Sequence, residues 1–362
     1  MSWFVIHLIA WLVTLLLAVV LTRVFRAMAS RWELWDKPQS EHHKNHTRPT
    51  AVVGGLAMWS AWILAMAGGL AGAWLLRGIL PEQLREEING IATVGRTLAV
   101  IAGGGTILAL MGLKDDKKAM PASRKFLVQF LVAALTAILG PRILVGYVPA
   151  WISWILTTLW LATIINAMNF FDNMDGLTGG VSFIAFVFLF VIATIRGQYF
   201  VALLTALSSG AVLGFLFYNY PKATVFMGDC GSHFLGYLLG VCCILTTFYH
   251  HENTPNLLAV AIPLMVLAVP LLDAMVVVII RLRLHKPIYV GDNRHLSHRF
   301  VQIGLSRPLA VAAIWLLSFL AGAGALSLLW LPPLGALLIL AQMLAMLALV
   351  LLIQLGAHPP AG

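Results

Sequence analysis

Long, uninterrupted runs of apolar residues constrain this chain more than any other feature of its sequence. A helix needs about 20 mostly apolar residues to cross the hydrocarbon core of a bilayer. Continuous apolar runs of this length predict helices, whereas a porin-type barrel would show short alternating segments. Eleven runs qualify: Trp3–Leu21, Ala51–Leu76, Thr97–Leu113, Phe126–Leu144, Trp151–Met168, Gly179–Ile195, Phe200–Tyr218, His233–Tyr249, Leu257–Ile280, Leu309–Trp330 and Leu334–Leu355. Only 10% of the 362 residues are charged, which excludes a soluble enzyme. We therefore expect an all-α polytopic membrane protein with one integral membrane domain over residues 1–362.

The positive charges are sorted between the loops. If the loops alternate between the two sides of the membrane, one set holds 18 of the 23 Lys and Arg residues. That set comprises residues 22–50, 114–125, 169–178, 219–232 and 281–308. Because an excess of Lys and Arg marks the cytoplasmic side, we expect an outside N-terminus and a cytosolic C-terminus. The net charge of +9 then reflects topology, and no nucleic-acid partner is expected.

Two adjacent carboxylates, Asp115 and Asp116, stand where the third run ends, among several lysines. Carboxylates this close repel each other unless cations or a metal compensate, and Lys125 follows nearby. Taken alone, the segment is also explained as a solvated, positively charged loop. The pair therefore becomes a candidate site only together with its neighbours.

A second polar group ends the fifth run. Asn166, Asn169 and Asp172 are three residues apart, so a helix would place them on one side, and Asp175 follows. Amide and carboxylate oxygens without a local Lys or Arg suit a hard cation such as Mg²⁺ or a polar ligand. An ordinary helix C-terminus capped by Gly176 is the alternative interpretation.

A glycine turn precedes the eighth run. Gly228 and Gly231 flank Asp229, and the backbone N–H groups of such a turn at a helix N-terminus can approach phosphate. Asp229 would then hold a metal, because a bare carboxylate repels a phosphate. A plain turn with Ser232 as the helix N-cap explains the same residues.

A cationic group lies in the last loop of the set. In a helix His295 and His298 would share a face, with Arg294 and Arg299 beside them, and such side chains suit phosphate oxygens. A zinc site and a solvated basic surface are the alternatives. Asp273 lies inside the ninth run, where an ionisable group is costly; a structural and a catalytic role both remain open for it.

The long first loop of the set adds Lys44 and His46, although a flexible connector would also explain it. Together, the loops on one membrane face offer acids for a divalent cation, amides, a glycine turn and basic groups for phosphate. Phosphoryl transfer requires this set of groups. Nucleotide donors are found on the cytosolic side, and a lipid acceptor would enter from the bilayer.

These residues resemble a known family. The chain is similar to the polyprenyl-phosphate sugar-1-phosphate transferases (glycosyltransferase family 4) over nearly its whole length, in four motifs: Asp115-Asp116, Asn166-x-x-Asn169-x-x-Asp172-x-x-Asp175-Gly176, Gly228-Asp229-x-Gly-Ser232 and His295-x-x-His298-Arg299. It resembles most the WecA-type branch, which transfers N-acetylhexosamine-1-phosphate from a UDP-sugar to undecaprenyl phosphate with Mg²⁺ and releases UMP. The phospho-N-acetylmuramoyl-pentapeptide branch is less similar, because its three consecutive histidines are absent.

The resemblance implies a role for each matching residue. Asn169 and Asp229 would hold Mg²⁺, or alternatively Mn²⁺, and Asp115 and Asp116 would activate or orient the lipid phosphate. The residues with implied catalytic roles are Asp115, Asp116, Asp172, Asp175, His295 and His298. The residues with implied substrate-binding roles are Lys44, His46, Lys125, Asn166, Arg294 and Arg299.

The resemblance also implies partners and a location. We expect a UDP-sugar donor, undecaprenyl phosphate, the lipid bilayer and a second copy of the chain as partners, in the cytoplasmic (inner) membrane of a bacterium. Three positions depart from the family pattern: Asn173 replaces a glycine, Ser297 replaces a frequent histidine, and Arg294 directly precedes His295, whereas related loops often place the arginine one residue earlier. The sugar is therefore open, with N-acetylglucosamine expected. The rival hypothesis is a transporter or flippase of an anionic substrate, which Asp273 alone favours.

Overall fold

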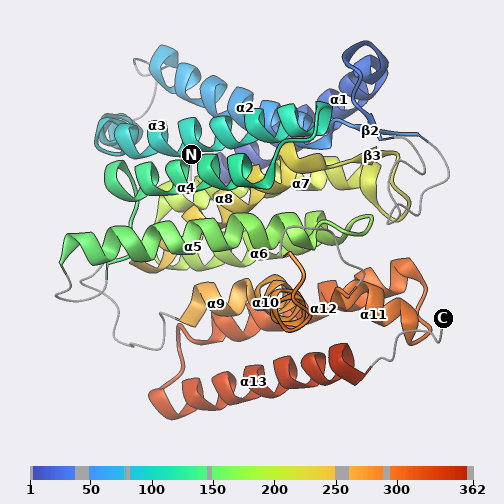
Figure 1. The fold of residues 1–362 in the computed structure, drawn as a ribbon. Helices are drawn as coiled ribbons and strands as arrows, with labels where there is room; N and C mark the ends of the chain where they lie inside the picture. The colour runs from blue at the N-terminus through green and yellow to red at the C-terminus, as the bar shows by residue number, and fades with distance from the viewer. Residues whose placement is uncertain are drawn as a thin grey trace.

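The chain folds into a bundle of long helices that lie side by side (Figure 1). The computed structural model describes residues 3–36, 49–76, 78, 82–144, 149–248, 261–287 and 294–356. Among these residues, ten helices are long and apolar enough to cross a membrane. They are α1 (Trp3–Trp32), α2 (Gly54–Leu76), α3 (Glu82–Lys117), α4 (Ala122–Leu139), α5 (Ala150–Phe171), α6 (Leu177–Ile195), α7 (Tyr199–Asn219), α8 (Gly228–Phe248), α12 (Arg307–Ser327) and α13 (Pro333–Gly356). The predicted all-α polytopic membrane fold is confirmed.

The ninth predicted span, Leu257–Ile280, is not one helix. Its described part forms α9 (Ile262–Val266) and α10 (Ala268–Arg283), which meet at Leu267. In a continuous helix, the residue at position 270 would donate its backbone N–H to the carbonyl of Val266, and this residue is Pro270. Proline has no N–H to donate to that carbonyl, and its ring would clash with it. Figure 1 shows α10 nearly end-on, whereas the long helices cross the view, so α10 leaves the direction of the bundle.

Several predicted boundaries shift at the end of the bundle where the polar motifs lie. Helix α1 continues to Trp32, and α3 continues to Lys117, so basic residues and the acidic pair that we expected in loops are helical. Helix α8 begins at Gly228, five residues before the predicted start. In α4 the helix ends at Leu139, because Gly140 and Pro141 do not continue a helix.

A small sheet, which was not predicted from the sequence, joins three chain segments at this end of the bundle. Strands β1 (Trp35–Asp36) and β2 (Thr50–Val52) are antiparallel, and β2 is parallel to β3 (Val225–Phe226). Residues 51–52 therefore form a strand, and α2 starts at Gly54 rather than at Ala51. The sheet connects the end of α1 and the start of α2 to the turn before α8. It thereby fixes the N-terminus of α8.

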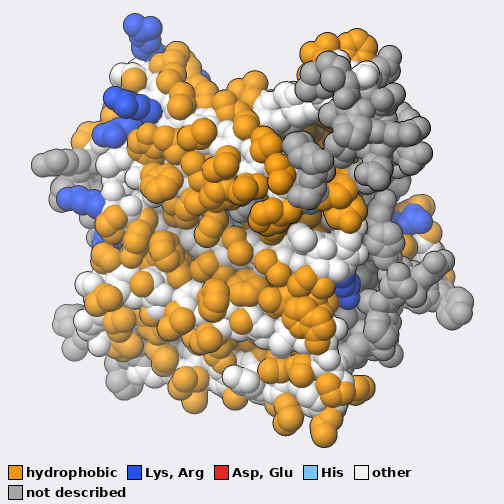
Figure 2. Space-filling view, turned by 180° about the vertical axis from the view of Figure 1, so that it is seen from behind, with side chains coloured by type: hydrophobic (Ala, Val, Ile, Leu, Met, Phe, Trp, Pro, Cys, Tyr) orange, Lys and Arg blue, Asp and Glu red, His pale blue; other side chains and the backbone are white. Residues whose placement is uncertain are grey.

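Helix α8 is the most enclosed of the ten long helices, and it contacts α2, α3, α5, α6 and α7. Small residues allow this close packing. A side chain at Gly112 of α3 would lie 2.4 Å from the backbone of Asp229, and one at Gly55 of α2 would lie 2.1 Å from the backbone nitrogen of Gly231. By contrast, large apolar side chains cover much of the face shown in Figure 2, and many others are exposed along the long helices. An apolar belt of this extent fits contact with lipid, and the chain is a multi-pass membrane protein.

The described parts of the five loops predicted to share a membrane face lie at one end of the bundle (Figure 1). That end contains the small sheet, the C-termini of α3 and α5, the N-termini of α4 and α8, and the short helix α11 (Leu296–Gln302). The side of the membrane that this end faces stays a prediction, which rests on the distribution of Lys and Arg.

Candidate active site

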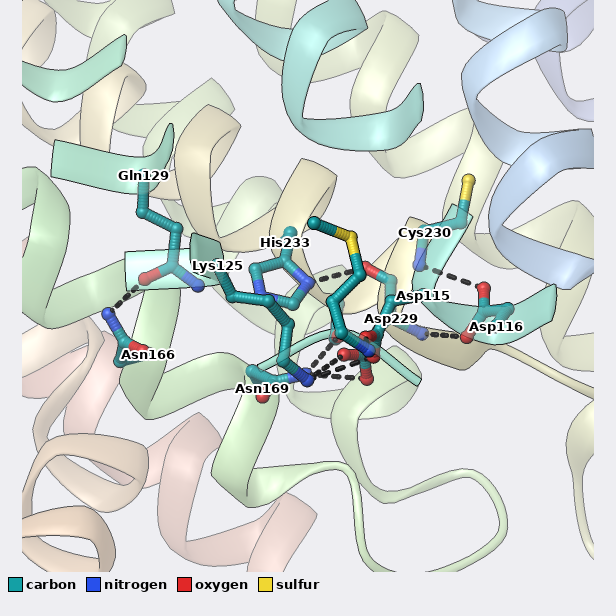
Figure 3. A network of polar contacts seen from close by, with 11 residues as sticks. Asp115, Asp116, Lys125, Gln129, Asn166, Asn169, Asp229, Cys230 and His233 are labelled. Carbon is teal, nitrogen blue, oxygen red and sulfur yellow. Dashed lines mark hydrogen bonds and ion pairs between the residues drawn. The ribbon is translucent and has the colours of Figure 1, made fainter. Parts of the chain in front are cut away.

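Four helix ends meet at a cluster of charged and amide side chains (Figure 3). Asp115 comes from the last turn of α3, Lys125 from the first turn of α4, Asn169 from the last turn of α5 and Asp229 from the first turn of α8. These residues lie far apart in the sequence, and the packing of α8 against its neighbours brings them together. The structure thus brings residues of three separate motifs together, and their role as one site stays a prediction.

Asp229 is held through both of its carboxylate oxygens. Asn169 donates from Nδ2 to Oδ1 of Asp229 at 3.0 Å and to Oγ of Ser232 at 2.9 Å. Lys125 donates from Nζ to Oδ2 of Asp229 at 3.1 Å and to Oδ2 of Asp115 at 2.9 Å. A quarter of the Asp229 side chain remains exposed, so the carboxylate is oriented by the protein and still accessible to a ligand.

The adjacent acids Asp115 and Asp116 occupy different environments, although the family resemblance implies the same role for both. Asp115 accepts from the backbone N–H of Met120 at 2.6 Å as well as from Lys125. Asp116 accepts from the backbone N–H groups of Asp229 at 2.7 Å and Cys230 at 3.1 Å. Figure 3 shows this acid on the other side of the α8 turn from the lysine. Asp116 therefore caps the N-terminus of α8 from a neighbouring helix.

The conformation of Gly228 makes this cap possible. Its φ angle is +71°, in the region where glycine has no steric penalty. In addition, a Cβ atom at Gly228 would lie 2.6 Å from Oδ2 of Asp116. The glycine is thus needed both for the turn and for the approach of the carboxylate. The alternative in which Ser232 caps the helix is wrong, because α8 begins at Gly228 and Ser232 accepts a bond from Asn169.

A second layer of polar side chains lies deeper in the bundle. Asn166 donates from Nδ2 to Oε1 of Gln129 at 2.7 Å and to the carbonyl of Ala162, and Gln129 is buried. Gln129 is four residues after Lys125 on α4, so both side chains lie on the same face. His233, four residues after Asp229, contacts the Asp229 carbonyl through Nδ1 at 2.6 Å. Sequence reasoning missed Gln129 and His233, although their helical spacing to Lys125 and Asp229 was a usable signal.

The loop between α5 and α6 carries two more predicted acids. Desolvation by the surrounding protein raises the pKa of the Asp172 carboxyl to about 7, and the negative charges of Asp229 and Asp175 act in the same direction. Asp175 accepts from the backbone N–H of Ala223 at 2.9 Å, which ties this loop to the turn before β3. The alternative in which Gly176 caps α5 is wrong, because α5 ends at Phe171.

The predicted cationic group lies at the short helix α11 and in the two residues before it. His295 precedes the helix and contacts Asp273 of α10, and both side chains are buried. Arg299 is largely buried and donates to Gln302 at 2.9 Å, whereas Arg294 and His298 are partly exposed. The predicted substrate-binding residues Lys44 and His46 lie outside the described residues.

Two of the three departures from the family pattern contact each other. Ser297 of α11 donates from Oγ to Oδ1 of Asn173 in the α5–α6 loop, at 2.5 Å. This bond links α11 to the loop that carries Asp172 and Asp175. It therefore connects the cationic group to the acidic part of the site.

The residues of the cluster fit a magnesium ion. Mg²⁺ prefers hard oxygen ligands and usually takes one or two carboxylates, with waters and substrate phosphates completing its shell. Asp229 and Asp115 supply two carboxylates, and Asn169 retains its amide oxygen after donating from Nδ2. Among the described residues, no group of three His, Cys, Asp or Glu side chains suited to one metal is found. The zinc alternative for His295 and His298 therefore gains no support.

Comparisons with known proteins point to the same chemistry. Residues 98–247 match the model of glycosyl transferase family 4. The chain is 32% identical to a probable undecaprenyl-phosphate N-acetylglucosaminyl 1-phosphate transferase of Bacillus subtilis, over 86% of this chain and 82% of that protein. It is also 32% identical to a decaprenyl-phosphate N-acetylglucosaminephosphotransferase of Mycolicibacterium smegmatis, over 88% and 81%. A phospho-N-acetylmuramoyl-pentapeptide-transferase of Limosilactobacillus fermentum is 29% identical, over 87% and 93%.

The helical bundle and the acidic cluster at its end, together with these similarities, define a membrane-embedded phosphotransferase. The chain belongs to glycosyl transferase family 4. The resemblance read from its four motifs is thereby confirmed.

Proposed function

We propose that the protein transfers a sugar-1-phosphate, N-acetylglucosamine-1-phosphate in the first instance, from a UDP-sugar to undecaprenyl phosphate. The products are undecaprenyl-diphospho-sugar and UMP, and the reaction would be the first membrane step of a cell-envelope polysaccharide pathway. The observation that carries the proposal is the convergence of Asp115, Lys125, Asn169 and Asp229 at one end of a membrane bundle. The names of the relatives support the choice of sugar and acceptor.

Each part of the cluster has a task in this reaction. Lys125, which bridges two carboxylates, would turn to the phosphate of the lipid and neutralise its charge. Arg294, His295 and His298 would bind the diphosphate of the donor, and Asp172 and Asp175 would lie near the nucleotide. Lys44 and His46 are proposed to contribute further positive charge. Phosphoryl transfer depends mainly on such positioning and charge neutralisation.

The family depends on a divalent metal, and we propose Mg²⁺, with Mn²⁺ as a substitute. Asp229 would hold the ion, with Asn169 and Asp115 beside it. When bound, the ion supplies positive charge to the donor diphosphate and stabilises the leaving phosphate. The protein keeps Asp229 in place for this purpose through Asn169 and through the Asp116 cap of α8.

The contacts of the acids favour a direct displacement. An oxygen of the lipid phosphate attacks the β-phosphorus of the donor, the bond from that phosphorus to the bridging oxygen breaks, and UMP leaves with the electron pair. An aspartyl-phosphate would need a carboxylate oxygen as the nucleophile, and hydrogen bonds to a carboxylate oxygen weaken it as a nucleophile. Both oxygens of Asp115 and both oxygens of Asp116 already accept hydrogen bonds.

We further propose that the site end of the bundle faces the cytosol, in a bacterial inner membrane, and that two copies of the chain form a homodimer. The distribution of Lys and Arg supports this orientation. The rival transporter hypothesis rested on Asp273. That residue contacts His295 and the backbone of α11, which lies at the site end of the bundle, so it no longer favours a transport pathway.

The decisive experiment follows UMP release by purified protein in detergent with undecaprenyl phosphate, Mg²⁺ and a panel of UDP-sugars. We expect UMP with UDP-N-acetylglucosamine, and loss of UMP with EDTA and in Asp229→Asn. Arg142→Gln, an exposed charge change in the segment after α4, serves as a matched control and should retain activity. If folded protein releases no UMP from any donor and binds no radiolabelled UDP-sugar, the proposed transferase activity is wrong.

A further inference from the structure

We propose that Asp273 is a positioning residue of the active site, which fixes the orientation and the tautomer of His295. This inference deepens the proposed function, because it assigns a task to an acid that no motif of the site includes. It concerns how the donor-binding histidine is held, and not the chemistry of the transfer itself.

The carboxylate of Asp273 contacts two consecutive residues. Its Oδ2 lies 2.6 Å from Nδ1 of His295, and its Oδ1 accepts from the backbone N–H of Leu296 at 2.7 Å. Only 2% of Asp273 and 5% of His295 are exposed. Because both oxygens are used on adjacent residues, the carboxylate determines both where α11 begins and how the imidazole is turned.

Helix α11 depends on this contact for its start. His295 is the N-cap residue of the helix, and its side chain makes no capping bond of its own. The first N–H groups of a helix lack partners within the helix and need them from elsewhere. Asp273 of α10, 23 positions before Leu296, supplies the partner for the N–H of that residue. An unpaired carboxylate at this depth would be costly, so the contact also accounts for an acid inside an apolar helix.

The contact selects one tautomer of the imidazole. An ionised carboxylate only accepts hydrogen bonds, so Nδ1 of His295 must carry the proton that lies between them. Nε2 is then the ring atom that remains for a ligand, and its direction is set by the ring orientation. For a histidine that binds a donor diphosphate, this fixes which atom is presented to the phosphate oxygens.

A second bond holds the other side of α11. Ser297 donates to Asn173 of the α5–α6 loop at 2.5 Å. The segment is thus attached to α10 before its first turn and to the acidic loop within that turn. Because this segment is attached to two different elements, it has little freedom to rotate, and His295 is held with it.

The test is the substitution Asp273→Asn. The amide oxygen can still accept from Leu296, but the amide N–H₂ faces Nδ1 of His295 and forces the other tautomer, with the proton on Nε2. We expect kcat/KM for the UDP-sugar to fall about 10- to 100-fold, mainly through a higher KM of the donor, as for other residues that orient a functional histidine, while the KM for undecaprenyl phosphate stays unchanged. Glu33→Gln, the same change of charge and group at an exposed position near the site end, should behave as the unmodified protein.

Two further measurements separate positioning from a general effect on folding. In a double-mutant cycle, Asp273→Asn combined with His295→Ala should be no slower than His295→Ala alone. In ¹⁵N-histidine-labelled protein, the His295 signal, identified by its absence in His295→Ala, should report the Nδ1–H tautomer, and Asp273→Asn should convert it to Nε2–H.

Three results would overturn the inference: full activity of Asp273→Asn, multiplied rate losses in the double variant, or the Nε2–H tautomer in the unmodified protein. The tautomer is measured without substrate. Absence of UMP release by the unmodified protein would therefore contradict the proposed function, while the tautomer would still decide the role of Asp273.

Discussion

The two polar regions at the site end of the bundle are built in different ways. The acidic cluster around Asp229 lies on the most enclosed helix, between α3, α4 and α5, and each of its side chains comes from a long helix. The cationic group lies on α11, a helix of seven residues, which is attached through Asp273 and Ser297. The first region is rigid because long packed helices fix it, whereas the second depends on a few polar contacts.

This difference predicts which property of the reaction each region controls. Groups that stabilise a developing charge must be held in place before the reaction, and the Asp229 cluster has this character. A segment that holds a departing nucleotide is better supported by a small number of contacts that can adjust. We therefore expect substitutions in the first region to affect kcat and stability, and substitutions around α11 to affect the KM of the donor.

The largest effects should separate the two adjacent acids. Asp115→Asn and Asp116→Asn should each lower kcat on the order of 10²- to 10³-fold. Only Asp116→Asn should also lower the free energy of unfolding, on the order of 2 kcal/mol, because one N–H of the α8 N-terminus then loses its acceptor. UMP release and thermal unfolding of both variants test this expectation. Equal melting temperatures for the two variants would show that Asp116 does not cap α8.

A smaller effect should appear in metal affinity. The ammonium group of Lys125 lies between Asp115 and Asp229, where it competes with a cation for the same oxygens. Lys125→Met should therefore bind Mn²⁺ severalfold more tightly, on the order of 1 kcal/mol for a partly exposed pair, while kcat falls. Electron paramagnetic resonance of free Mn²⁺ measures the affinity. Lys125→Arg keeps the charge and should bind as the unmodified protein; weaker binding by Lys125→Met would contradict this role.

The pH dependence should report on Asp172, whose pKa is raised to about 7. A proton on Asp172 removes a negative charge that acts on Asp229, the residue proposed to hold the metal, so the Mg²⁺ concentration for half-maximal rate should rise as pH falls below about 7, by at most tenfold per pH unit. Without metal, the folded chain binds this proton more tightly than the unfolded chain, whose carboxyl has a pKa of 3.8. The stability that it contributes is thus present at low pH and lost between about pH 4 and pH 7.

Asp172→Asn serves as the comparison for both effects, because its side chain does not titrate. The stability difference between pH 5 and pH 8 in EDTA, measured by thermal unfolding, should be smaller in this variant than in the unmodified protein. An identical pH profile in the two proteins would mean that Asp172 does not titrate near neutral pH.

The smallest effect is expected at the bond between Asn173 and Ser297. One hydrogen bond contributes about 0.5–1.5 kcal/mol, so Asn173→Ala and Ser297→Ala should each raise the KM of the UDP-sugar a few-fold and leave kcat nearly unchanged. The double variant should be no worse than either single one. If kcat falls instead, α11 takes part in positioning the reacting groups, and the contrast between the two regions is smaller than we infer.

Much of the architecture was predictable from local patterns. Ten of the eleven predicted spans are single long helices in the described part of the chain. Continuous apolar runs predict helices well, because a lipid environment leaves a single chain segment few other structures. The break in the ninth run also had a local signal, since Pro270 stands inside it, but hydropathy alone passes over a proline. The three short strands could not be predicted, because segments of two or three residues show no periodicity and depend on partners distant in sequence.

The sequence predicted which residues belong to the candidate site, but it did not predict which role each of them has. Asp115, Asn169 and Asp229 were identified because acids and amides at the ends of apolar helices are costly unless they are used. Nothing in the sequence separates Asp115 from Asp116, since neighbouring residues of a helix point in directions about 100° apart and the packed neighbours decide what each one meets. Likewise, the contact between Asp273 and His295 could not be predicted from the sequence, because only the fold brings the two residues together.

The membrane fold, the family and the types of side chain at the site could therefore be inferred without a structure, because each follows from composition, hydropathy or short motifs. The tertiary structure decided which acid caps α8, which faces Lys125, and which holds the histidine of α11. The physical reason is that hydrogen bonds act over about 3 Å. Partners such as Asp116 and Asp229, 113 positions apart, come within that distance only when the helices pack.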